Sequence, residues 1–335
     1  METYKNWSSI PTTSEVLCLT HFNLNDKVLI AAGFANSELS VWDIDSKEEE
    51  KLFITLSSHF SAVNTLCPTK LDDKIHLLSG DESGYIHLYD LTHKDSLIKK
   101  INPHSGAIKC IVTVFLQNEE MVVSAGEDSK IKVYRAFLKE ELVTLSGHQG
   151  IVKTLHVCSF NNTTYIISGG YDNMVNVWNP LNANCNLVMG LSGHDSWILC
   201  LTFTKLNGKE VIVSGGNDNK IKVWNPLFSE KLLKTWNPIG KENKKLLMTL
   251  YGHKDSVTSL ATVRWSEFGK NKEFIMSGSN DGTIKIWDPS IDLKEICSIT
   301  IGKGPVRCLT DYVLNNEVAI VSGGNTDIEV WKKEI

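Results

Sequence analysis

Histidine, serine and aspartate recur in this sequence at a spacing that could support nucleophilic catalysis. His194 is followed by Ser214 and Asp218, and a similar group occurs at four places along the chain. A histidine base oriented by a carboxylate can activate a serine hydroxyl. A nucleophilic site is needed only once, however, and no strained nucleophile turn or oxyanion loop accompanies these groups. The repetition therefore favours a structural role, and we expect that the protein is not an enzyme.

Each group combines a histidine, a serine, an aspartate and a closing aromatic residue. In three groups the aromatic residue is tryptophan, and in the fourth it is tyrosine. The groups are His148, Ser168, Asp172 and Trp178; His194, Ser214, Asp218 and Trp224; His253, Ser277, Asp281 and Trp287; and His104, Ser124, Asp128 and Tyr134.

The segments between these residues show the alternation of β-strands. Apolar and polar residues alternate with a period of two, as in residues 221–224, and no stretch shows helical periodicity. The closing aromatic residues recur every 44 to 47 residues, with one interval of 63, at Trp42, Tyr89, Tyr134, Trp178, Trp224, Trp287 and Trp331. Each of the seven copies has room for four strands.

The Gly193-His194 dipeptide, the Ser-Gly-x-x-Asp turn that begins at Ser214 and the closing Trp224 resemble WD40 repeats. The resemblance covers essentially the whole chain. It implies an all-β fold, a seven-bladed β-propeller of four-stranded sheets, as one domain over residues 1–335 with an insertion around residues 229–246. In that family the histidine, serine, aspartate and tryptophan form a hydrogen-bonded tetrad that fixes the turn of the blade, so the four groups above take that role.

The repeat pattern decays toward both ends of the chain. The first copy has Ala32 and Asn36 at the serine and aspartate positions, the second has Ser83 at the aspartate position, and the seventh has Lys303 instead of Gly-His. We expect these blades to be less stiff. The last copy ends too soon after Trp331 to form its fourth strand, so residues 3–9 are expected to supply it and to close the ring.

Composition and the termini narrow the class of protein. The net charge of −5 argues against a protein that coats nucleic acid through its global charge. The start of the chain has no signal sequence and no apolar run is long enough to span a membrane. We therefore expect a cytoplasmic or nuclear protein that contacts no membrane and is monomeric on its own.

Four of the eight cysteines occupy one equivalent position on the innermost strands: Cys18, Cys110, Cys200 and Cys308. A small residue suits the crowding near the axis of the ring. A ring of four metal ligands is the alternative, but alternate blades around a wide channel would hold the thiols apart, and no Cys-x-x-Cys pair is present. We expect reduced cysteines, no metal and no cofactor.

The resemblance also implies a recognition surface at the end of the ring that carries the Gly-His loops. Trp197 and Tyr171 fall there on consecutive repeats, and exposed aromatic residues are typical of binding hot spots. Trp197 packed against the next blade is the alternative. Weaker candidates and nearby charges complete the predicted partner-binding set: Phe34, Phe60, Glu82, Lys109, Glu127, Lys153 and Arg307. Such a mixed surface suits a peptide with an anchor residue and charges.

A basic patch is expected at the opposite end of the ring. It comprises the insertion and a lengthened first loop of the next copy, with Lys231, Lys234, Lys241, Lys244, Lys245, Arg264, Lys270 and Lys272. A solvated loop and docking to an acidic partner such as RNA are the two interpretations. The main hypothesis is a non-catalytic protein–protein interaction scaffold or adaptor subunit without a small-molecule substrate. The alternatives are a nucleic-acid-associated subunit and an enzyme with a channel site.

Overall fold

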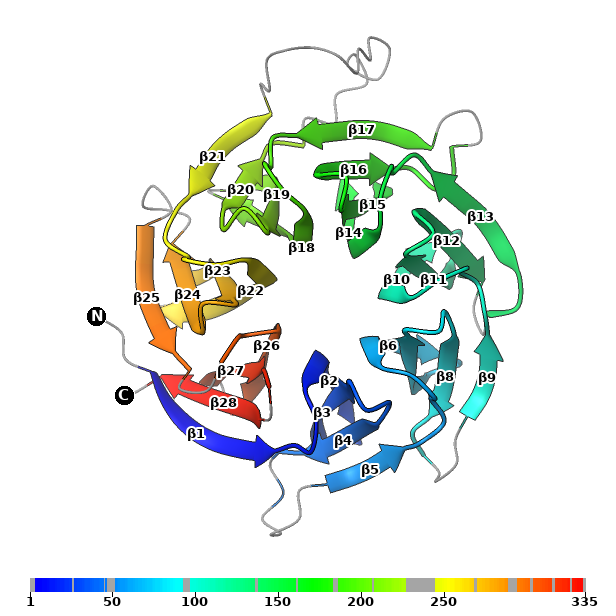
Figure 1. The fold of residues 1–335 in the computed structure, drawn as a ribbon, viewed down its shortest axis with the longest axis horizontal. Coiled ribbons are helices and arrows are strands. Elements are labelled where there is room, and N and C mark those ends of the chain that lie inside the picture. The colour runs from blue at the N-terminus through cyan, green and yellow to red at the C-terminus, as the bar shows by residue number, and fades with distance from the viewer. Residues whose placement is uncertain are drawn as a thin grey trace.

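The period-two segments form antiparallel strands, and seven four-stranded sheets stand as blades around a common axis in this computed structural model (Figure 1). The structure describes residues 4–333 except 26, 45, 47–51, 93–96, 136–137, 161, 183–185, 207, 227–244, 268–269, 289–293, 302–303, 315–316 and 326. Within these residues the chain forms 28 strands and no α-helix. The predicted all-β seven-bladed propeller is therefore confirmed.

The first three blades follow one another along the chain, each running from an innermost to an outermost strand. Blade 1 comprises β2 (Val16–Leu24), β3 (Lys27–Phe34), β4 (Leu39–Asp43) and β5 (Leu52–Leu56). Blade 2 comprises β6 (Val63–Leu71), β7 (Lys74–Asp81), β8 (Ile86–Asp90) and β9 (Leu97–Ile101). Blade 3 comprises β10 (Ile108–Leu116), β11 (Glu119–Gly126), β12 (Lys130–Arg135) and β13 (Glu141–Ser146).

The next three blades have the same order. Blade 4 comprises β14 (Val152–Phe160), β15 (Thr163–Gly170), β16 (Met174–Trp178) and β17 (Leu187–Ser192). Blade 5 comprises β18 (Ile198–Leu206), β19 (Lys209–Gly216), β20 (Ile221–Trp224) and β21 (Leu246–Leu250). Blade 6 comprises β22 (Val257–Glu267), β23 (Lys270–Ser279), β24 (Thr283–Asp288) and β25 (Lys294–Thr300).

Blade 7 joins the two ends of the chain. It comprises β26 (Cys308–Leu314), β27 (Glu317–Gly323), β28 (Asp327–Lys333) and, as its outermost strand, β1 (Tyr4–Pro11). β1 runs antiparallel to β28 from Tyr4 opposite Lys333 to Pro11 opposite Asp327 (Figure 1). The predicted closure of the ring by the N-terminal strand is confirmed. Because β1 pairs with β28, the edge of β28 is not left open.

The apolar residues of the strands fill the spaces between adjacent blades. One buried cluster, for example, combines Ile167 and Val177 of blade 4 with Ile198 and Ile212 of blade 5. The glycine of the repeated Ser-Gly pair allows adjacent blades to approach closely. A Cβ atom on Gly215 would lie 2.6 Å from a methyl carbon of Val257 on the next blade. Any side chain there would force neighbouring blades apart.

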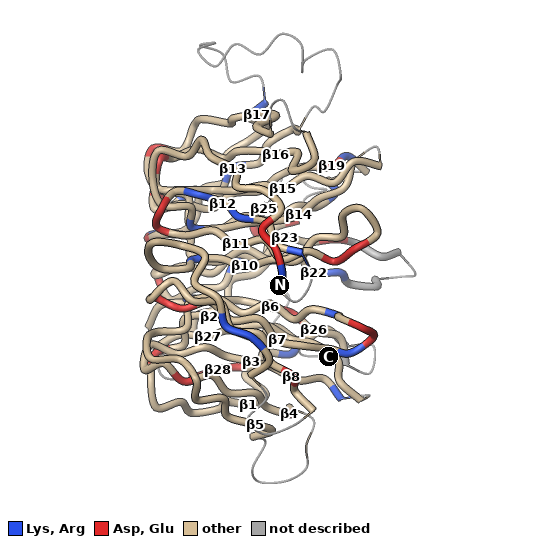
Figure 2. Tube along the Cα trace, turned by 90° about the vertical axis from the view of Figure 1, so that its right-hand side faces the viewer, with Lys and Arg blue, Asp and Glu red and all other residues tan. Residues whose placement is uncertain are grey.

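Seen from the rim, the ring is a flat disc, and acidic segments recur in the turns along one of its two ends (Figure 2). In the middle blades the turn between the second and third strands bears the repeated aspartate. The residue after it has a positive φ, 65° at Asn173 and 64° at Asn219, which asparagine tolerates better than most residues. Among the described residues, no helix has the length and apolar character to cross a membrane.

Candidate functional site

The tetrad of blade 5 is a directional chain of hydrogen bonds. The indole N–H of Trp224 donates to the Ser214 hydroxyl at 2.8 Å, and this hydroxyl bonds Nε2 of His194 at 2.7 Å. Nδ1 of His194 lies 2.9 Å from a carboxylate oxygen of Asp218. Since the indole only donates and the carboxylate only accepts, the serine hydrogen points to Nε2 and the imidazole hydrogen lies on Nδ1. The Ser214 side chain is fully buried, so the serine bridges the core of the blade to the Gly-His loop.

Blades 4 and 6 repeat this chain, as the resemblance implied. The indole-to-serine distances are 2.7 Å for Trp178 and Ser168 and 2.9 Å for Trp287 and Ser277. Burial alone would raise the pKa of Asp281. The hydrogen bonds from Thr283, the Lys254 amide and His253 outweigh burial and lower this pKa to about 2. The aspartate thus stays ionised and ties the Gly-His loop to the turn.

Blade 3 lacks the last link. His104 bonds Asp128 and Ser124, each at 2.8 Å, as predicted. The hydroxyl of Tyr134, however, donates to Glu141 on the outermost strand at 2.9 Å. The assignment of Tyr134 to a tetrad was therefore wrong. In blades 4 to 6 the indole N–H donates to the serine, whereas the Tyr134 hydroxyl extends past Ser124 and donates to Glu141 instead.

Blade 2 has a rewired network that the sequence did not reveal. His59 bonds Asp81 at 2.8 Å and Ser79 at 2.5 Å, so the carboxylate comes two residues earlier than the repeat predicts, and Ser83 is not its substitute. The imidazole of His87 stacks on His59 with ring centroids 3.8 Å apart. The order Ser79-Gly80-Asp81 was the available signal for this displaced acid.

His59, Asp81 and His87 also form the one group with metal-ligand spacing among the described residues. Both ring nitrogens of His59 are already hydrogen-bonded. The planes of the two imidazoles differ by only 8°. Lone pairs in parallel, stacked planes do not converge on one tetrahedral ion. The arrangement therefore fits a polar core network better than a metal centre.

The predicted partner-binding set centres on an aromatic stack at the Gly-His end of the ring. The rings of Tyr171 and Trp197 are parallel, with centroids 4.3 Å apart and an interplanar angle of 5°. Trp197 nevertheless remains 46% exposed. The two interpretations of Trp197 are thus partly combined: its ring packs on blade 4 through Tyr171 and still faces solvent.

Charged members of the set form ion pairs at the same end of the ring. Lys109 forms ion pairs with Glu82 and Glu127, each at 3.1 Å. Arg307 pairs with Glu15 at 2.8 Å across the junction of blades 7 and 1. Glu15 was missed as a pairing partner, although the sequence placed it before the first inner strand.

Two aromatic candidates differ in solvent exposure. Phe60 is 91% exposed, and the ammonium of Lys100 lies 5.5 Å from its ring centre. Phe34 is only 4% exposed and meets Trp42 edge-on in the core. The assignment of Phe34 to a partner surface was wrong, because blade 1 lacks the histidine and serine and fills their place with this ring.

The predicted basic patch is only partly within the described residues. Lys231, Lys234, Lys241 and Lys244 lie outside them, as does Lys303 of the seventh copy. Arg264, Lys270 and Lys272 were expected in a loop, but they belong to β22 and β23, whose pairing continues to Glu267 opposite Lys270. Arg264 pairs with Glu273, and burial lowers the pKa of Lys245. Docking of RNA there stays a prediction.

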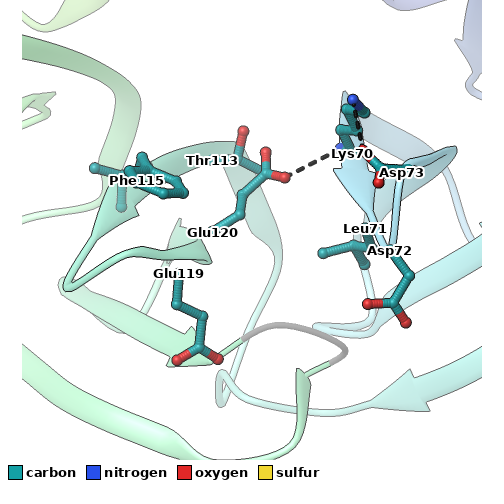
Figure 3. Close-up of a pocket in the computed structure, with 9 residues that line it drawn as sticks. Lys70, Leu71, Asp72, Asp73, Thr113, Phe115, Glu119 and Glu120 are labelled. Carbon is teal, nitrogen blue, oxygen red and sulfur yellow. Dashed lines mark hydrogen bonds and ion pairs between the residues drawn. The ribbon is translucent and has the colours of Figure 1, made fainter.

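The same opposite end carries an acidic pocket of about 540 Å³ between the first turns of blades 2 and 3. Asp72, Asp73, Glu119 and Glu120 line it together with Lys70, which lies at one edge beside Asp73 (Figure 3). Lys70 pairs with Asp73 at 2.9 Å, and Glu120 accepts a hydrogen bond from the Lys70 amide. Lys70 thus contacts two of the four carboxylates of the pocket.

The inner-strand cysteines serve contacts between blades. Cys18 and Cys200 each lie with Sγ 3.4 Å from a carbonyl oxygen of the next inner strand, and both thiols are buried. Burial raises the pKa of Cys18 to about 12. A protonated thiol is a poor metal ligand and suits this donor role.

Comparison with known families supports the repeat assignment independently. The family model described as WD domain, G-beta repeat, matches residues 95–135, 139–179, 185–225 and 244–288, which together make up half of the chain. These matches correspond to blades 3 to 6, where the tetrad pattern is best kept.

Curated relatives match shorter parts of the chain. Protein transport protein SEC31 of Dictyostelium discoideum is 27% identical over 47% of this chain and 12% of its own length. Protein transport protein SEC13 of Chaetomium thermophilum is 31% identical over 32% of this chain and 35% of its own length. Restriction of telomere capping protein 1 of Candida dubliniensis is 27% identical over 45% of this chain and 14% of its own length. The chain therefore covers far less than two thirds of each relative.

Proposed function

Because this chain belongs to the WD40-repeat family, we propose that it is a non-catalytic scaffold or adaptor subunit that binds a protein partner through the Gly-His end of its ring. The stack of Tyr171 and Trp197 is the observation that carries this proposal. The names of the SEC13 and SEC31 relatives direct the search for the partner to protein-transport assemblies.

The aromatic stack has the properties of a binding anchor. Stacking on Tyr171 holds the Trp197 ring in place before any partner arrives, so little side-chain entropy is lost on binding. Its half-exposed face offers a large apolar area, and tryptophan and tyrosine are enriched at binding hot spots. The ion pairs of Lys109 beside it supply a polar border.

A comparison of two aromatic truncations tests the proposal. We expect Trp197→Ala to reduce the partner proteins recovered with the tagged chain by about tenfold or more. Loss of the stack should lower the melting temperature by only about 3 °C. Quantitative mass spectrometry of purified complexes and a thermal melt measure the two effects.

Phe115→Ala is the matched control, because Phe115 is 66% exposed but lies in the first strand of blade 3 near the opposite end. This variant should recover the same partners as the wild type. Equal recovery by Trp197→Ala and the wild type would contradict the proposal, and a loss in both variants would place the contact elsewhere.

A further inference from the structure

The innermost strands carry a ring of β-bulges at the Gly-His end. In blades 1 to 6 the second residue of the inner strand has no opposite residue on the second strand of the same blade. A bulge redirects the side chain that it carries. These bulge residues are Leu17, Asn64, Lys109, Lys153, Leu199 and Thr258.

Most polar bulge residues have a partner within the protein. Asn64 donates to the Ile108 carbonyl of the next blade at 3.1 Å, and the Thr258 hydroxyl donates to the Val306 carbonyl. Lys109 is neutralised by two glutamates. Internal contacts therefore satisfy the polar groups of three of the four polar bulge positions.

Lys153 is the exception. Among the described residues, its ammonium forms no hydrogen bond and no ion pair, although the side chain is partly buried. It interacts electrostatically with Glu82 and Lys109. Lys153 belongs to β14, the innermost strand of blade 4, which lies next to the axis of the ring (Figure 1). Burial and the nearby Lys109 lower its pKa and outweigh the opposing effect of Glu82.

The nearby carboxylates are already engaged. Glu82 bonds Asn64 at 2.6 Å and Lys109 at 3.1 Å. Glu127 pairs with Lys109 and also accepts a hydrogen bond from the Ala107 amide at 3.3 Å. Both acids are in direct contact with Lys109, so Lys153 is left without a direct ion pair among the described residues.

The aromatic stack borders the same sector. The Tyr171 amide donates to the carbonyl of Ile151, two residues before Lys153, at 2.9 Å, and Trp197 lies on the Tyr171 ring. A segment anchored on Trp197 is therefore next to the bulge ring of blades 3 and 4. Because Glu82 and Glu127 stand close by, a single negative charge fits better than the double charge of a phosphate.

We infer that the bound partner is an acidic peptide segment whose aspartate or glutamate carboxylate pairs with Lys153 while a neighbouring residue packs on Trp197. This inference rests on the proposed function. The carboxylate supplies the missing counterion at a partly desolvated position, where a charge-assisted hydrogen bond is strong. Lys153 thereby selects among peptides by charge, and Trp197 anchors them.

A stability measurement gives the first test. An unpaired, partly buried charge costs free energy of folding, so we expect Lys153→Met to raise the melting temperature at pH 7. The gain should shrink as the pH rises toward 10.5, because the folded pKa is lowered and the wild-type ammonium loses its charge. Lys209→Met, at the exposed start of β19 in blade 5, is the matched control and should change little. A lower melting temperature for Lys153→Met would show an internal role and overturn the inference.

A selection from a random peptide library displayed on phage gives the second test. We expect the peptides retained by the wild type to be enriched in aspartate or glutamate over the input library. Replacing the acid by its amide, or Lys153 by Met, should each weaken binding of a synthetic selected peptide by about tenfold. The two changes combined should cost little more than one, which identifies the pair.

The outcomes separate this inference from the proposed function. Peptides that need Trp197 but are not acidic, or are insensitive to Lys153→Met, overturn the inference and leave the proposed face intact. Peptides insensitive to Trp197→Ala contradict the proposed function itself. As a measurement independent of selection, the methyl NMR signal of ¹³C-dimethylated Lys153 should shift on addition of glutarate, and an unchanged signal counts against the inference.

Discussion

Two arcs of the ring are held together in different ways. Blades 4 to 6 form the regular arc, in which each blade has an unbroken chain from tryptophan through serine and histidine to aspartate. Blades 7, 1 and 2 form the junction arc. There Trp331 donates to Ser322 without a histidine beyond it, blade 1 relies on the packing of Phe34 against Trp42, and blade 2 uses a displaced aspartate.

The difference shows that a blade can be held by strand pairing where the side-chain hydrogen bonds of the tetrad are incomplete. In the junction arc the backbone of β1 pairs along the whole of β28, and Asn6 bonds Glu329 at 3.3 Å. The Val16 amide also donates to the Gly324 carbonyl between blades 1 and 7 at 2.9 Å. The chain ends meet in blade 7, so contacts between residues far apart in the sequence stand there beside the single bond of Trp331 to Ser322.

Removing the closure strand should have the largest effect on this comparison. Deletion of residues 1–11 exposes the edge of β28 and uncovers the apolar neighbours of Ile10 in the blade 7 and blade 1 core. We expect the melting temperature to fall by roughly 10 °C or more. Differential scanning calorimetry measures the fall.

A peptide of residues 1–11 added to the truncated protein is the control for this prediction. If β1 acts by pairing, the peptide should recover part of the lost stability in a concentration-dependent way. An unchanged melt after deletion would show that the junction arc is held by its other contacts, and the contrast between the arcs would lose its basis.

Removing the central serine should have the next largest effect, and a different size in each arc. Ser214→Ala leaves the Trp224 indole and Nε2 of His194 without their partner, which we expect to cost about 2–4 kcal/mol. Ser322→Ala leaves only the Trp331 indole, for a cost of about 1–2 kcal/mol. Chemical denaturation measures the loss of unfolding free energy in both variants. Equal losses would argue against the hydrogen-bonded tetrad as the contact that distinguishes the regular arc.

The sequence predicted the regular arc well because each tetrad lies within one repeat. The tryptophan follows the serine by 10 residues in all three blades, and the histidine precedes it by 20 or 24. The strand that carries Ser214 is paired with its sequence neighbours. The closure was also predictable, since the seventh copy visibly lacked a strand. The replacement of a tetrad by the buried Phe34 was not, because a lone phenylalanine before a turn gives no sign of its direction.

The sequence proposed members of the candidate site by their repeat positions, but it did not predict how their side chains pair. Trp197, Tyr171 and Lys109 were all placed at the Gly-His end by their repeat positions. Whether two rings stack, or which lysine receives the glutamates, depends on side-chain directions across blades. Lys109 and Lys153 occupy equivalent positions in consecutive repeats, yet only the three-dimensional arrangement shows that one is paired and the other has no ion pair among the described residues.

The rewired network of blade 2 contains a group that should respond to acid. His87 is fully buried against His59, and burial lowers its pKa to about 3. Its Nδ1 faces the hydroxyls of Ser58 and Tyr89, while its Nε2 has no hydrogen-bond partner among the described residues. Protonation would place an unmet N–H and a charge in the core.

The smallest effect at neutral pH is expected for His87→Asn, since asparagine occupies the equivalent position in blade 4 as Asn176. The unfolded chain binds a proton near pH 6.5 and the folded chain near 3, so the wild type loses stability as the pH falls through this window. The variant should lose less, by up to about 1.4 kcal/mol per pH unit within the window. Denaturation series at several pH values measure the difference, and Asn176→His should create the same acid sensitivity in the regular arc. Parallel pH profiles for wild type and His87→Asn would mean that His87 does not distinguish the two arcs.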